Sequence, residues 1–141
     1  MDSFKVLKNA LSADEFLNLF TAVGWGAPSY EQVEIALENS YVTFSVKDGD
    51  TVVGMARLLG DGAMSYYVKD LAVLPEYQGK GIGRLLVHAI DDYIKTQMID
   101  GTAVSVELMS SAGKEDFYKK MGFAVCPNAS QGSGMLKMIR R

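Results

Sequence analysis

The sequence predicts a single mixed α/β domain over residues 1–141, with a central sheet of about six or seven strands and helices on both faces. Three observations predict it. A chain of 141 residues with 48% hydrophobic and 22% charged residues has the size and composition of one globular domain. Strand-like and helical segments cover the chain without a repeat, a low-complexity tract or a linker. Two late strand-like segments are joined through a long helical one, so we expect those two strands to be parallel.

The chain begins with a short strand and two capped helices. Residues 4–8 alternate apolar and polar side chains, as a half-buried strand does. Ser12 with Glu15, and Ser29 with Gln32, have the spacing of capping boxes. Each pair therefore predicts the start of a helix.

Two hairpins follow. The β-rich segments 41–47 and 51–59 flank an Asp-Gly-Asp sequence at 48–50, which is typical of a hairpin turn. A Gly-Asp-Gly sequence at 60–62 predicts a second turn, leading into a strand over 65–74.

The second half of the chain alternates helices and strands. The expected elements are, in order, a helix over 82–98, a strand over 103–108, a helix over 112–121 and short strands over 123–126 and 135–139. Gly122 is expected to end the second of these helices in a left-handed conformation. The complete order is β-α-α-β-β-β-α-β-α-β-β.

Composition and charge disfavour several classes of function. The formal net charge of −3 argues against a nucleic-acid partner, because phosphate contacts favour a basic face. Neither a signal peptide nor an apolar run of roughly 18 residues is seen, so no membrane partner is expected. The lone Cys126 cannot form an intramolecular disulfide and is expected to be a small buried residue. One histidine and one cysteine do not suggest a metal site. We expect a cytoplasmic protein.

A glycine-rich junction joins the strand over 65–74 to the long helix that follows it. Gly79, Gly81 and Gly83 stand at every second position, with the cations Lys80 and Arg84 among them. Glycines adopt positive φ and carry no Cβ, so successive N–H groups can converge on an anion at the helix N-terminus. A tight turn that uses glycines for geometry alone explains the pattern equally well.

The two common nucleotide motifs do not fit this junction. Leu74 stands where a P-loop has its first glycine. Arg84 or Leu86 stands where a dinucleotide fingerprint has its third.

Residues 78–83, QGKGIG, match another pattern, Q/R-x-x-G-x-G/A. Preceded by the strand-like LAVLPEY, they resemble the pyrophosphate loop of the GNAT superfamily of acetyl-CoA-dependent N-acetyltransferases. The sequence FYKKMGF at 117–123 resembles that superfamily's late helix and turn, where a tyrosine is followed by a Gly-Phe pair. The order of elements is also similar, so the resemblance covers nearly the whole chain. It implies a GNAT fold with acetyl-CoA as the acyl donor.

The resemblance also implies where acetyl-CoA binds. In this family the cofactor lies where two parallel strands splay apart, with the pantetheine arm along one strand and the pyrophosphate on the glycine loop. Ser111 stands where the family often has an asparagine, and its hydroxyl can make one of the same hydrogen bonds. The implied cofactor-binding residues are Leu71, Ala72, Val73, Gln78, Gly79, Lys80, Gly81, Ile82, Gly83, Arg84 and Ser111.

Two proton transfers are needed for acetyl transfer to an amine. Tyr118 resembles the family's tyrosine that protonates the departing thiolate, the alternative being an aromatic side chain that only packs. Asp70, a carboxylate in a largely apolar strand, is expected to contact the acceptor amine or orient a water, or else to form a structural ion pair or accept an N–H hydrogen bond. Glu107 is a second candidate base, and an ordered-water relay is a third. Tyr67 stands where many family members have a glutamate, so the base cannot simply be transferred.

The acceptor pocket is the least determined part of the site. Trp25 and Tyr30 lie between the first two helices, where the family lines its acceptor pocket, although they could equally pack one helix on the other. Tyr67 and Glu107 complete the expected substrate-binding residues. We expect direct transfer to a primary amine of a small molecule in a ternary complex. The alternatives are a protein acetyltransferase and an acetyl-CoA sensor without turnover. Homodimers are common in the family.

Overall fold

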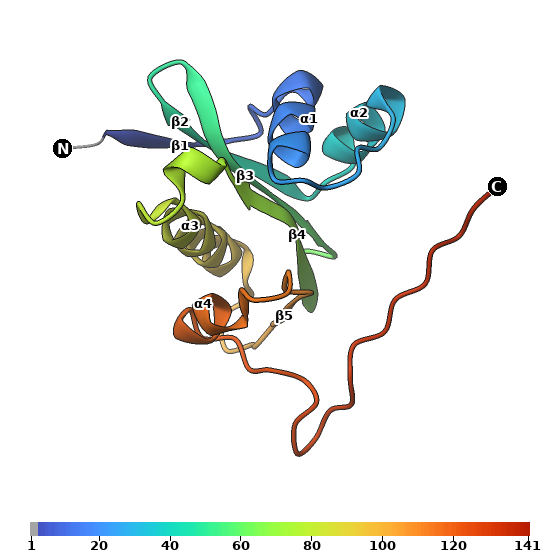
Figure 1. Ribbon diagram of the computed structural model, residues 1–141. Helices are drawn as coiled ribbons and strands as arrows, with labels where there is room; N and C mark the ends of the chain where they lie inside the picture. The colour runs from blue at the N-terminus through green and yellow to red at the C-terminus, as the bar shows by residue number, and fades with distance from the viewer. Residues whose placement is uncertain (1–2) are drawn as a thin grey trace. The chain divides into compact units, whose positions relative to one another are not determined.

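The computed structural model describes residues 3–141, which fall into two units, 3–108 and Met109–Arg141. The first unit contains a five-stranded sheet in the order β1-β2-β3-β4-β5 (Figure 1). The strands are β1 (Phe4–Lys8), β2 (Val42–Asp48), β3 (Thr51–Gly60), β4 (Ser65–Val73) and β5 (Ser105–Leu108). Neighbours from β1 to β4 are antiparallel, and β4 and β5 are parallel. The two hairpins, β2–β3 and β3–β4, and the parallel pairing of β4 with β5 are as the sequence predicts.

Helices cover both faces of this sheet. The helices of the first unit are α1 (Ala13–Ala22), α2 (Tyr30–Glu38) and α3 (Ile82–Gln97), with a short 3-10 helix η1 (Pro75–Tyr77) before α3. The helices α1 and α2 lie on one side of the sheet and α3 on the other (Figure 1). Consecutive residues in the middle of β2 and β3 are buried for this reason, including Phe44, Met55 and Leu58. The predicted mixed α/β class is therefore confirmed.

The residues of the two predicted capping boxes form the expected hydrogen bonds. The Ser12 hydroxyl accepts a hydrogen bond from the Glu15 N–H at 3.1 Å, and the Glu15 carboxylate accepts one from the Ser12 N–H at 2.9 Å. Ser29 and Gln32 make the same reciprocal pair at the start of α2. Gly49 adopts φ 61° in the first hairpin turn, which glycine permits without steric cost.

A close contact between β3 and α3 gives a first prediction. A Cβ atom at Gly54 would lie 2.7 Å from Ile82 Cγ2 and 3.4 Å from Leu86 Cδ1, both in buried side chains. Gly54→Ala should therefore destabilise the fold by about 1–3 kcal/mol, measured by chemical denaturation. Gly26→Ala is the matched control, since a Cβ there would have no atom within 4 Å. Equal unfolding midpoints for the two variants would contradict this packing.

The second unit contains the helix α4 (Glu115–Lys120). Gly122, at φ 96°, follows the end of this helix, as the sequence predicts. The strands predicted over 123–126 and 135–139 are wrong, because no strand is assigned after Leu108 in the described chain. Met135 is 92% exposed and Ile139 83% exposed, so this apolar segment has the sequence of a strand without a buried face to stabilise one. The sheet consequently has five strands, fewer than expected.

No helix within residues 3–141 is long and apolar enough to cross a membrane.

Candidate functional site

The glycine-rich junction forms a loop with an open surface. Gly79 and Gly81 adopt φ 80° and 84°, and a Cβ at either position would have no atom within 4 Å. The positive φ angles are therefore what requires glycine at these two positions. Gly81 is the N-cap of α3 and supplies no side-chain cap, while Gly83 lies in the first turn of that helix. First-turn N–H groups without a side-chain acceptor fit an anionic ligand.

Tyr77 connects this loop to the first hairpin. Its hydroxyl donates a hydrogen bond to Asp48 Oδ2 at 2.7 Å, and its ring packs edge-on against Phe4. The Lys80 ammonium lies over the same ring, 5.2 Å from its centroid. The loop is thus attached to the sheet at its start, and one of its cations is held beside it.

The β5-facing edge of β4 opens just before the glycine loop. The parallel pairing of β4 with β5 ends at Val68 and Leu108, whereas β4 continues to Val73. Leu74 donates its N–H to the Val53 carbonyl at 2.9 Å. Because backbone groups alternate along a strand, those of Leu71 and Val73 point away from β3, toward the edge that β5 leaves open. This edge can accept an extended polar chain as an added strand.

The Gln78 side chain also lies at this edge. Its Nε2 donates a hydrogen bond to the Val73 carbonyl at 3.1 Å, so it joins the end of β4 to the start of the loop. The other implied side chain, Arg84, is exposed on the first turn of α3.

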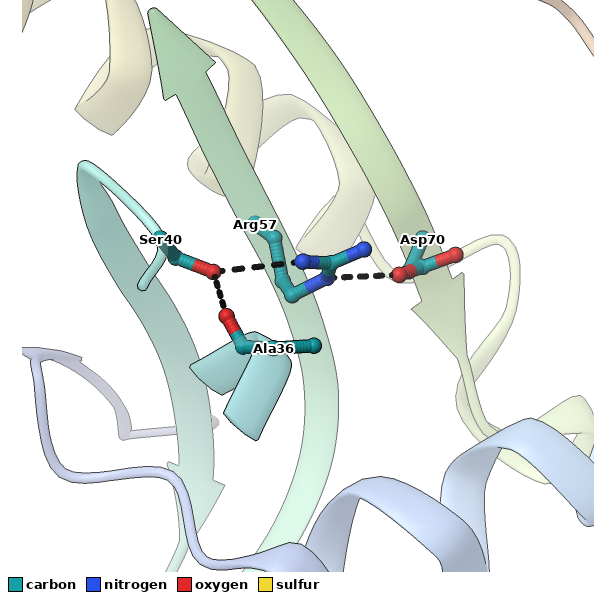
Figure 2. A network of polar contacts seen from close by, with 4 residues as sticks. All are labelled: Ala36, Ser40, Arg57 and Asp70. Carbon is teal, nitrogen blue, oxygen red and sulfur yellow. Dashed lines mark hydrogen bonds and ion pairs between the residues drawn. The ribbon is translucent and has the colours of Figure 1, made fainter. Parts of the chain in front are cut away.

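Asp70 forms an ion pair in the structure. Its Oδ2 lies 2.7 Å from Arg57 Nε, and the two side chains are only 12% and 13% exposed. Figure 2 shows how the network continues, since Arg57 Nη1 donates to the Ser40 hydroxyl and that hydroxyl donates to the Ala36 carbonyl of α2. Of the roles expected for Asp70, the ion pair is present. A role beside the acceptor amine stays a prediction.

Arg57 and Tyr77 do not appear among the residues predicted from sequence. Arg57 is a lone charge in the apolar segment TVVGMARLL, and such a charge needs a partner when its strand is buried. That signal could have indicated a pair with Asp70, the carboxylate in the next strand. Tyr77 has no comparable signal, because its partner Asp48 lies 29 residues earlier in the chain.

The expected acceptor residues fall into two sets. Tyr67 and Glu107 are direct neighbours in the parallel register of β4 and β5, with Tyr67 half-buried and Glu107 exposed. Trp25 packs edge-on against Phe20 of α1, with ring centroids 5.0 Å apart, as a packing residue would. Tyr30 is 49% exposed at the first residue of α2. The structure therefore places Tyr67 beside Glu107.

The second unit contains Ser111 and Tyr118. Tyr118 lies on α4, and its ring packs edge-on against those of Phe117 and Phe123, at 5.0 and 5.8 Å between centroids. Burial raises the pKa of the Tyr118 phenol above its ordinary value of 10.0, so the hydroxyl keeps its proton at neutral pH. The Ser111 carbonyl accepts a hydrogen bond from the Lys114 N–H at 3.0 Å, just before α4. Cys126 is exposed, so the expectation that it is buried is wrong.

Comparison with known proteins assigns a family to this arrangement. Residues 39–125 match the family model described as an acetyltransferase (GNAT) domain. A GNAT-family acetyltransferase from Streptococcus pneumoniae is 34% identical, with a TM-score of 0.81 over 99% of this chain and 100% of that one. A probable acetyltransferase from meticillin-resistant Staphylococcus aureus is 29% identical, with a TM-score of 0.83 over 96% and 100%. An uncharacterized N-acetyltransferase from Pyropia yezoensis is 29% identical over 86% of this chain and 74% of its own length.

Proposed function

The chain belongs to the GNAT acetyltransferase family, and from this premise we propose that it transfers acetyl from acetyl-CoA to a primary amine of a small molecule. Residues 1–141 would act as a single N-acetyltransferase domain, by direct attack in a ternary complex. We also propose that the protein is cytoplasmic and forms a homodimer.

The observation that carries the proposal is the continuity of the open β4 edge with the left-handed glycine loop. The backbone groups of Leu71 and Val73 suit a polar pantetheine arm, and the N–H groups at Gly79 and Gly81 suit a pyrophosphate. A ligand that combines an extended amide chain with a pyrophosphate fits both parts, and coenzyme A has this composition. The residues proposed to hold it are Leu71, Ala72, Val73, Gln78, Gly79, Lys80, Gly81, Ile82, Gly83, Arg84 and Ser111.

The proposed chemistry needs one proton donor and one proton acceptor. Acetyl-CoA supplies an activated acetyl group as a thioester. Tyr118 is the proposed donor, because its phenol holds a proton at the Oη atom throughout the neutral range. The acceptor amine has a reference pKa of about 10.4 and must lose a proton before it can attack. Asp70, Glu107 or a relay of ordered water is proposed to take it.

The acceptor is proposed to contact Trp25, Tyr30, Tyr67 and Glu107. Because Tyr67 and Glu107 are neighbours across β4 and β5, they offer an aromatic face beside a carboxylate. A protonated amine is attracted to both groups, which suits an acceptor that arrives as a cation.

A panel of amines tests the proposed function. The purified chain is mixed with acetyl-CoA and with single members of a set of small primary amines and of lysine-containing peptides. Free thiol release and the mass of the acetylated amine are measured together. We expect turnover with small amines. Turnover restricted to peptides would favour the protein acetyltransferase, and tight acetyl-CoA binding without any turnover would favour the sensor.

The Tyr77 hydrogen bond gives a prediction for this site. Tyr77→Phe removes the bond to Asp48 and keeps the ring beneath Lys80, so the loop loses one attachment. Affinity for acetyl-CoA should fall by roughly fivefold, the equivalent of about 1 kcal/mol. Titration calorimetry on Tyr77→Phe, Asp48→Ala and the double variant measures it. Because the two residues share one bond, the double variant should be no weaker than either single variant, and additive losses would contradict the shared role.

A further inference from the structure

Asp70 has a backbone conformation that is uncommon for residues other than glycine. Its φ is 55°, and within residues 3–141 Asn9 is the other non-glycine residue with positive φ. The left-handed region costs most side chains roughly 1–2 kcal/mol, and aspartate enters it more readily than most because its short polar side chain can form a hydrogen bond there. The pairing of β3 with β4 shifts register at the same place, between Met55 opposite Ala72 and Arg57 opposite Lys69. Asp70 therefore forms a strained bend in the middle of a strand.

The ion pair with Arg57 opposes this strain. Its Nε–Oδ2 distance of 2.7 Å is that of a charge-assisted hydrogen bond, and the low exposure of both side chains reduces screening by salt. Arg57 is held in turn by the Ser40 hydroxyl at 3.3 Å, directly after α2. The Ser40 hydroxyl donates to the Ala36 carbonyl at 2.7 Å (Figure 2). The bend in β4 is thus connected to the end of α2 by side chains.

The position of the bend determines what it controls. Leu71 follows Asp70 directly, and its backbone groups face the edge that β5 leaves open. Along β4, the backbone N–H and C=O groups of successive residues point alternately toward β3 and toward the open edge. If the bend relaxed, this alternation would shift by one residue, and the groups of Leu71 and Val73 would no longer point to the open edge. Asp70 is the charged residue directly before the segment Leu71–Val73.

We propose that Arg57 is a positioning residue, which holds the left-handed bend at Asp70 and thereby aims the backbone of Leu71–Val73 at acetyl-CoA. This inference rests on the proposed function for the identity of the ligand. The bend itself does not depend on that identity. Arg57 acts through Asp70, which it contacts together with Ser40.

Substitutions at Asp70 separate the bend from the charge. Asp70→Ala loses the ion pair and places in the left-handed region a residue that tolerates it less well than aspartate, so affinity for acetyl-CoA should fall by about tenfold. Asp70→Gly also loses the pair but adopts positive φ freely, so its loss should be smaller, about threefold. Asp70→Asn tolerates the left-handed region and can still accept from Arg57 Nε, so it should bind almost as tightly as the wild type.

Substitutions at Arg57 test the partner. Arg57→Gln should weaken binding by about as much as Asp70→Ala, roughly tenfold. Combined with Asp70→Gly it should add no further loss, because the pair is already absent. Lys69→Gln is the matched control, since it removes an exposed cation from the same strand, at the register position opposite Arg57. Its affinity should equal that of the wild type.

The experiment measures acetyl-CoA affinity by titration calorimetry, and amide hydrogen exchange in the free protein, for all these variants. Support requires the stated order of affinities, with faster exchange of the Ala72 N–H in Arg57→Gln and Asp70→Ala than in Lys69→Gln, because alternation directs that N–H toward β3. Unchanged exchange of the Ala72 N–H, an Asp70→Gly as weak as Asp70→Ala, or faster exchange spread evenly through α1 and α3 would each overturn the proposal. A wild-type chain that fails to bind acetyl-CoA would refute the proposed function instead, and the exchange of the Ala72 N–H would still decide whether Arg57 holds the bend.

Discussion

Tyr118→Phe is expected to lower kcat by about a hundredfold while the KM for acetyl-CoA changes little, because a general acid contributes roughly 10²–10⁴ to a rate. Phenylalanine keeps the ring that packs against Phe117 and Phe123, so α4 and the turn after it should remain folded. The change removes only the hydroxyl group, and with it the proton at Oη. Steady-state rates of thiol release, with the amine that gives the fastest turnover, measure the effect.

The pH profile provides a second readout for Tyr118. Burial raises the pKa of its phenol above 10.0, so the donor form is complete at neutral pH and is lost as the pH rises through this raised pKa. The wild-type kcat should therefore hold through mildly alkaline pH and decline only beyond it, and Tyr118→Phe should lack this decline. Tyr93→Phe removes a hydroxyl from α3 and serves as the control. A Tyr118→Phe enzyme with the wild-type kcat would show that the acid assignment is wrong.

The second large effect is expected at the glycine loop. Gly81→Ala places a side chain at φ 84°, where an L-residue is strained by about 1–2 kcal/mol, so the loop should move to relieve it. The N–H groups would then diverge, and affinity for acetyl-CoA should fall by roughly tenfold. Gly79→Ala, at φ 80°, should act in the same way, and the double variant should lose about a hundredfold. Titration calorimetry gives these affinities.

Gly101→Ala is the matched control for this loss. Gly101 has φ 81°, and a Cβ there would also have no atom within 4 Å. An alanine at this position should therefore have about the same backbone strain as an alanine at Gly79 or Gly81. It lies between α3 and β5, outside the proposed coenzyme A site. All three single variants should lose similar stability in thermal unfolding. If Gly101→Ala weakened acetyl-CoA binding as much as Gly81→Ala, the loop would have no special part in holding the ligand.

Most of the first unit could be predicted from the sequence, because its signals are local. The capping pairs Ser12–Glu15 and Ser29–Gln32 span three residues, and the Asp-Gly-Asp turn at 48–50 requires only the conformation of its own glycine. The glycine loop could be predicted for the same reason, since positive φ at Gly79 and Gly81 is a property of each residue.

The contacts that position the loop and the bend have no such local pattern, although Arg57 and Asp70, as charges in apolar strands, each indicate the need for a partner. The Arg57–Asp70 pair joins residues 13 apart, and the Tyr77–Asp48 bond joins residues 29 apart. The first depends on the register of β3 and β4, and the second on how η1 lies against the end of β2. The register shift in β4 has no signature in the sequence around Asp70. The segment 135–139 shows the reverse case. Its apolar residues predict a strand, but a strand also needs a partner, which its own sequence does not supply.

Amide hydrogen exchange with and without acetyl-CoA decides whether the open edge of β4 and the glycine loop hold the cofactor, because it reports the ligand and its site in one measurement. We expect slower exchange on binding in two segments, 71–73 at the open edge of β4 and 78–84 across the glycine loop. A pantetheine fragment should protect mainly the first segment, and a nucleotide fragment with the pyrophosphate mainly the second. Protection confined to other parts of the chain, or no change at saturating acetyl-CoA, would rule out this coenzyme A site.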